Sequence, residues 1–119
     1  MSKIKGVLYR QDRDEPEEIE IEKDYREIQR IVGGLIEVVN PNQFGNQDDR
    51  IRGMEFYIDE EGRLKEGNIV NIEINSKYPY YSVLVGDVLV LGEGEESIPE
   101  ERIEQVIDSL REMRLAVER

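Results

Sequence analysis

The chain has 119 residues, which is enough for a single domain (1–119) with one buried core. It contains no cysteine, histidine or tryptophan, which excludes disulfides, cysteine- or histidine-dependent nucleophilic catalysis and the commonest metal ligands. Twenty-eight acidic residues against sixteen basic ones give a net charge of −12, so the surface repels phosphates and direct nucleic-acid binding is not expected.

The acidic charge has two interpretations that composition leaves open. One is solubility or life at high temperature, where Glu, Lys and Arg are enriched. The other is electrostatic mimicry of nucleic acid. The first ten residues are too polar for a signal peptide, and no apolar run approaches the ~20 residues of a membrane span. We therefore expect a cytoplasmic protein without a membrane segment.

The first two predicted elements are strands. Apolar residues at 4–9 predict one strand, and a polar turn ending at Pro16 follows it. Residues 17–22 read Glu-Glu-Ile-Glu-Ile-Glu, and the alternation from 18 to 22 is the period of a strand with one solvated face. We expect the two strands to form a hairpin. The outward side chains of the second strand, spaced about 7 Å apart, are Glu18, Glu20 and Glu22.

A helix, a strand and a loop are expected next. Asp24 opens the helix, and Glu27 stands three positions later, as in a capping box. Gly33-Gly34 ends the helix, because glycine accepts the left-handed backbone of a helix stop. Residues 35–39 predict a third strand. Residues 40–49 lack periodicity, so we expect an exposed, mobile loop.

The middle of the chain predicts a second hairpin. Residues 54–59 alternate as a strand. Residues 59–62 have the composition of a hairpin turn, in which Gly62 would supply a positive φ, and Leu64 begins the return strand. Residues 68–74 alternate again, with a slip in phase between Ile69 and Ile72 that a bulge would explain.

The last third predicts a buried strand and a helix. Residues 83–91 are apolar on both faces, so we expect them to be central, with Gly86-Asp87 either bending the run or dividing it. Ser97 and Glu100 predict a second capping box, followed by an amphipathic helix to about Val117. The predicted fold class is α+β: a mostly antiparallel sheet of about five to seven strands with two helices, the C-terminal one long and amphipathic.

Catalytic and metal-binding groups are not evident. The carboxylates fall mostly on the polar phases of strands and helices or in turns, where solvation is their ordinary role. No acidic cluster has the spacing of a calcium loop. Gly92 to Gly94 lacks the fingerprint of a phosphate loop, and the nearby glutamates would repel phosphate. We predict no catalytic residue, no metal and no cofactor, and therefore a binding protein rather than an enzyme.

Two groups of residues suggest a small anionic, nucleotide-like ligand. Clustered tyrosines suit base stacking or a protein interface, although they also suit packing at the edge of the core. Basic residues can anchor an anion or form ordinary surface ion pairs. The candidate ligand-binding residues are Arg50, Arg52, Arg63, Lys65, Lys77, Tyr78, Tyr80 and Tyr81. The alternative is a protein inhibitor or DNA mimic that binds a partner protein through Glu18, Glu20 and Glu22.

The order of several motifs resembles domain-of-unknown-function family 3846. The motifs are the glycine-led strand at 33–39, the Asp-Glu-Glu-Gly-Arg-Leu turn at 59–64, Asn68, and the Gly-Asp strand at 85–92, within a resemblance that spans about residues 3–110. The resemblance implies a small phage or mobile-element protein without a settled activity. A counter-defence role in the host cytoplasm is the expectation, by sequestering a ligand or binding a host protein. Homo-oligomerisation through an exposed strand or the tyrosines stays open.

Overall fold

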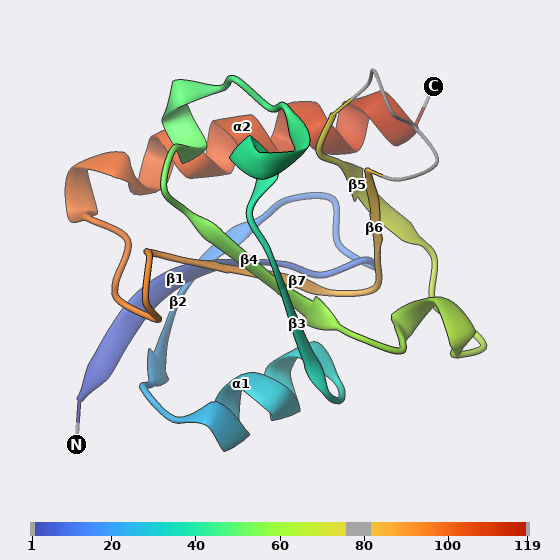
Figure 1. The fold of residues 1–119 in the computed structure, drawn as a ribbon, viewed down its shortest axis with the longest axis horizontal. Helices are drawn as coiled ribbons and strands as arrows, with labels where there is room; N and C mark the ends of the chain where they lie inside the picture. The colour runs from blue at the N-terminus through green and yellow to red at the C-terminus, as the bar shows by residue number, and fades with distance from the viewer. Residues whose placement is uncertain (1, 76–81, 119) are drawn as a thin grey trace.

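The computed structural model describes residues 2–75 and 82–118 of the chain. It has an antiparallel five-stranded sheet and a separate two-stranded sheet, with helix α1 on one face of the large sheet and helix α2 on the other (Figure 1). The predicted α+β class is therefore confirmed. The strands are β1 (Lys3–Tyr9), β2 (Glu17–Glu22), β3 (Ile36–Val39), β4 (Glu55–Asp59), β5 (Val70–Glu73), β6 (Val83–Val85) and β7 (Val88–Leu91), and the helices are α1 (Tyr25–Val32) and α2 (Ile103–Val117).

Strand β7 lies at the centre of the large sheet, whose strand order is β2-β1-β7-β4-β3. Its four residues are all buried. Val88 and Val90 pack in the core beneath α2, while Leu89 and Leu91 pack in the core beneath α1. Since both faces of this strand are covered, the run is apolar throughout, as the sequence predicts.

The apolar run at 83–91 is divided rather than bent. Gly86 has a φ of +84°, a left-handed conformation that suits glycine. The residues before it form β6, which pairs with β5 in the small sheet, and the residues after it form β7. The small sheet packs against α2, so β5, β6 and α2 together cover one face of the large sheet (Figure 1). The predicted bulge is confirmed as a register shift in β5 between Val70 and Ile72.

The predicted hairpin turn at 59–62 is wrong. Strand β4 pairs with β3 and β7, and the chain after it forms a 3-10 helix, η3 (Gly62–Leu64), instead of a return strand. The Asp59 carboxylate accepts the Glu61 amide at 2.9 Å, which bends the chain into this turn. Gly62 does not have a positive φ. A side chain there would come within 3.3 Å of the Val85 carbonyl, so close packing explains the glycine.

Two caps have different outcomes. Asp24 caps α1 by accepting the Arg26 amide, and Gly33 ends it with a φ of +97°, as predicted. Glu27 pairs with Arg30 instead of completing the box. The second capping box is wrong, because Ser97 accepts the Lys5 amide and Glu100 binds the Lys5 ammonium. Both side chains therefore fasten β1, and a 3-10 turn, η4 (Glu100–Arg102), leads into α2.

The segment predicted as a loop at 40–49 contains local structure. It includes the 3-10 helix η1 (Pro41–Phe44) and leads into a second, η2 (Asp49–Ile51). The Asn40 and Asp48 side chains cap these turns by accepting backbone amides. Pro41 is buried, so the segment is attached to the core at this point.

Candidate functional site

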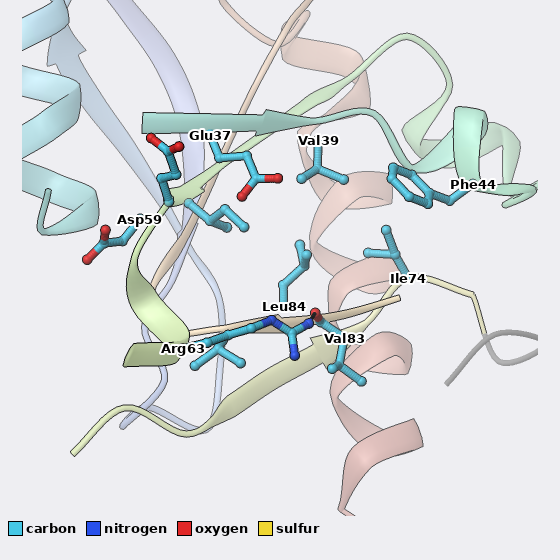
Figure 2. Close-up of a pocket in the computed structure, with 11 residues that line it drawn as sticks. Glu37, Val39, Phe44, Asp59, Arg63, Ile74, Val83 and Leu84 are labelled. Atoms are coloured by element: carbon cyan, nitrogen blue, oxygen red, sulfur yellow. Dashed lines mark hydrogen bonds between the residues drawn. The ribbon is translucent and has the colours of Figure 1, made fainter. Parts of the chain in front are cut away.

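A cavity of about 150 Å³ lies between β3 and β4 of the large sheet and β6 of the small sheet. Figure 2 shows side chains from β3 and β6 facing this space from opposite sides. Its apolar lining comes from both sheets and from η1, and its polar lining comes from the ends of β3, β4 and η3. The lining residues are Glu37, Val39, Phe44, Ile58, Asp59, Glu60, Arg63, Ile74, Val83, Leu84 and Val85.

The strand period explains why these side chains meet. Glu37 and Val39 are two positions apart on β3, so they point to the same face. Ile58 lies opposite Glu37 across the β3–β4 pair and shares that face. Leu84 is buried on β6 and reaches the same core. The cavity is therefore the open edge of the α2-side core, where the two sheets diverge.

Asp59 anchors one end of the cavity. It is only 5% exposed, and its carboxylate binds the Lys65 ammonium and the Glu61 amide. The same ammonium donates to the Gly33 carbonyl at 2.7 Å. A side chain at Gly34 would lie 2.9 Å from the Asp59 carboxylate. The glycine-led strand and the acidic turn of the sequence resemblance thus meet around one ion pair.

The cavity rim is acidic. Glu37 and Glu60 contribute carboxylates, Asp59 is already paired with Lys65, and Arg63 is the one cation among the described lining residues. The Arg63 guanidinium donates to the Val83 carbonyl at 2.8 Å and lies along β6 in Figure 2. A cavity with an apolar floor and an acidic rim favours an apolar group that carries a neighbouring positive charge.

The other predicted cations do not line this cavity. Arg50 binds two carboxylates, those of Asp48 and Glu112, which joins η2 to α2. The Arg50 guanidinium lowers the pKa of Asp48 to about 2, despite partial burial. The pKa of Arg50 is raised in turn, mainly by its hydrogen bond to Glu112 and also by its hydrogen bond to Asp48. Arg52 pairs with Asp49.

The four predicted cations with described positions therefore fall in three places. Arg63 lines the cavity, Lys65 lies behind Asp59, and Arg50 and Arg52 lie at η2. Their role in binding an anion stays a prediction. The remaining candidates, Lys77, Tyr78, Tyr80 and Tyr81, lie outside the described residues.

The predicted glutamate row is present on β2. Glu18 and Glu20 are exposed, and Glu22 is partly buried. Lys5 lies opposite Glu20 on β1, and its ammonium is 3.8 Å from Glu18 and 2.9 Å from Glu100. These contacts partly neutralise the row, so its negative potential is weaker than three isolated carboxylates would give.

The sequence reading missed Arg114, which is 7% exposed in α2. Its guanidinium stacks 4.0 Å from the Tyr9 ring and donates to the carbonyls of Asn71, Arg13 and Arg10. Position 114 lies one helical turn after Leu110, on the apolar face of α2, so the spacing alone could have predicted that this arginine is buried. The arginine ties the loop after β1 to β5 and α2.

A second polar cluster joins the other motif residues. Asn68 donates to the Gly62 carbonyl at 3.0 Å and accepts from the Gln11 side chain at 2.9 Å. The backbone N–H of Gln11 donates to the Asp87 carboxylate at 2.8 Å. These bonds hold η3, the start of β5 and the β6–β7 turn together. Asn68 thus supports the structure around the cavity, whereas other motif residues, among them Glu37, Glu60 and Arg63, line it.

The fold and cavity define a small α+β protein with an acidic-rimmed, apolar cavity at the edge of its sheet. The chain belongs to the family described as Domain of unknown function (DUF3846), which matches residues 4–111. Comparison with curated proteins finds no match, and comparison with solved structures finds none. Within residues 2–75 and 82–118, no helix could cross a membrane, and no group of three or more acidic side chains could hold a metal ion.

Proposed function

We propose that this protein is a non-enzymatic binding protein whose target is a basic segment of a partner protein. The observation that supports the proposal is the distribution of charge. Most described cations form ion pairs within the molecule, many of them at its surface, whereas the cavity rim presents carboxylates. The cations that pair with carboxylates are Lys5, Arg10, Arg13, Lys23, Arg30, Arg50, Arg52, Lys65, Arg111 and Arg114.

Two further cations are occupied by backbone acceptors. Arg63 donates to the Val83 carbonyl, and Arg102 donates to the carbonyls of Asp49, Arg50 and Arg52. A nucleotide entering the cavity would meet the carboxylates of Glu37 and Glu60, with Arg63 as the one cation among the described lining residues. We therefore rank a basic protein segment above a small anionic ligand as the target.

The biological setting of the proposal is inhibition by occupancy. A small phage-type protein that covers a basic segment of a host protein would act as a counter-defence factor in the host cytoplasm. The absence of cysteine and histidine from the sequence supports binding over catalysis. The glutamate row on β2 would add to the attraction for a basic partner at long range.

A peptide and nucleotide panel tests the proposal. Fluorescence polarisation would measure binding of short labelled peptides rich in Lys and Val or Leu, of matched peptides with Glu in place of Lys, and of labelled cyclic and linear nucleotides. We expect binding of the basic peptides only, weakening as salt is raised. Saturable nucleotide binding without basic-peptide binding would replace this function by the anionic-ligand one. Absence of binding to every probe would also refute it.

A further inference from the structure

The outer edge of β3 is an unpaired strand edge next to the cavity. Strand β3 ends the order of the large sheet, and among residues 2–75 and 82–118 it pairs with β4 alone. The other edge facing the cavity, that of β6, is already covered, because Arg63 donates to the Val83 carbonyl there. Charged side chains that cover a strand edge are a common protection against strand addition. Of the two edges that border the cavity, β3 is therefore the accessible one.

The register of β3 identifies its free backbone groups. The Leu35 carbonyl accepts a hydrogen bond from the Glu60 backbone amide at 2.7 Å, so the backbone groups of Leu35 face β4. Backbone groups alternate in direction along an antiparallel strand, which makes Glu37 the next residue bonded to β4. The N–H and C=O groups of Ile36 and Val38 therefore point away from the sheet. Within the described chain, these outward groups have no hydrogen-bond partner.

Apolar surface flanks this edge on both faces. On one face, the cavity reaches the Val39 side chain, and the adjoining Phe44 is 43% exposed. On the other face, Val38 is 49% exposed. A cavity near 150 Å³ holds one ring or one branched aliphatic group, as a cavity of about that size does when it binds benzene.

We infer that an extended segment of a partner protein adds to β3 as an antiparallel strand, with one apolar side chain in the cavity and basic side chains beside Glu37 and Glu60. The inference rests on the proposed function and deepens it by naming the site and the mode. Backbone hydrogen bonds to Ile36 and Val38 supply affinity, and the cavity supplies specificity. Side chains at alternate positions of the segment face the cavity, so the recognised pattern is basic, any, apolar, any, basic.

Charge favours this occupant over a second copy of the chain. Each copy carries a net charge of −12. Antiparallel pairing of two β3 strands around Glu37 would bring the two Glu37 carboxylates together on one face, where like charges are destabilising. A segment with lysine or arginine at those positions replaces that repulsion with attraction.

The test uses the full chain and the peptide Lys-Val-Leu-Val-Lys, capped at both ends. The variant Val38→Pro removes one outward N–H, which the fold does not use, and Val38→Ala is the matched control that keeps it. On the peptide, methylation of both valine amides removes the donors that face β3. Methylation of the leucine amide is the matched control, because that amide points away.

We expect Val38→Pro and the valine-methylated peptide each to weaken binding by about tenfold or more, and the two controls to weaken it less. The Val38 amide should also become protected from hydrogen exchange when the peptide binds. Equal binding by Val38→Pro and Val38→Ala, with no protection of that amide, would overturn the strand-addition mode and leave the proposed function standing. A β3-mediated dimer of the free chain that Val38→Pro dissociates would overturn the choice of occupant.

Discussion

Replacement of Arg114 by methionine should destabilise the fold strongly. Methionine keeps the apolar length of the side chain, so the change removes mainly the guanidinium. That group bonds the backbone and side-chain oxygens of Asn71 and the carbonyls of Arg10 and Arg13, and it stacks on Tyr9. The two oxygens of Asn71 are buried and lose their partner without access to water.

The size of the stability loss depends on which hydrogen-bond acceptors lose their donor and cannot be reached by water. Hydrogen bonds from a charged donor contribute about 1.5–3 kcal/mol each. The carbonyls of Arg10 and Arg13 are only partly buried and can recruit water, so we count the two Asn71 acceptors in full. The stacking on Tyr9 adds roughly 0.5–2 kcal/mol. Together these terms give an expected loss of about 3.5–8 kcal/mol of unfolding free energy, a large share of the stability of a small domain.

Urea unfolding followed by circular dichroism measures this loss. The matched control is Arg111→Met, one turn away on the same helix, where the arginine is exposed and pairs with Glu15 and Asp108. Exposed pairs contribute about 0–1 kcal/mol, so the control should lower stability little. A loss for Arg114→Met no larger than that for Arg111→Met would refute the reading of Arg114 as a buried tie.

Three further predictions concern stability and use the same unfolding measurement. Glu37→Pro should cost at least about 1 kcal/mol more than Val38→Pro, because the Glu37 amide bonds β4 and the Val38 amide does not; equal costs would show the register to be wrong. Asp48 has its pKa lowered to about 2 from an ordinary 3.8, so its contribution of about 2 kcal/mol should be present above pH 4 and lost as pH falls toward 2, and Asp48→Asn should remove that part of the acid dependence. Gly6→Ala should cost about 1–3 kcal/mol, because the added carbon would lie 2.6 Å from the Leu91 side chain and 2.7 Å from the Val90 carbonyl; a thermally neutral Gly6→Ala would contradict that packing.

Elements whose signal is local could be predicted from the sequence. The Glu-Ile alternation at 17–22 and the Asp24 cap carry their structure within a few residues. The apolar run at 83–91 also predicted a buried strand, because a strand that is covered on both faces is apolar throughout. Its division at Gly86 between two sheets could not be decided, since it depends on which partners each half finds.

The predicted turn and the second predicted cap are wrong because the same residues are compatible with two local structures. The turn at 59–62 contains the acids and glycine of a hairpin, yet Asp59 holds the chain in a 3-10 turn and binds Lys65. Ser97 and Glu100 have the spacing of a capping box, yet both bind Lys5, which is distant in sequence. At 59–62 the same local residues allow two turns, and the bonds of Asp59 select one of them. At Ser97 and Glu100 a partner distant in sequence replaces the local pattern, which cannot identify that partner.

Which residues meet at the candidate site also depends on partners that are distant in sequence. The sequence suggests that the scarce cations gather around an anion, and this stays a prediction. In the fold, Arg50 pairs with Asp48 and Glu112, and Lys65 pairs with Asp59. Because each internal pair neutralises one acid and one base, pairing leaves the acidic excess on the surface, part of it at the rim of an apolar cavity beside the free edge of β3. We propose a basic segment of a partner because it would satisfy both features at once: its positive charge suits the acidic excess, and an extended chain can pair with the free strand edge.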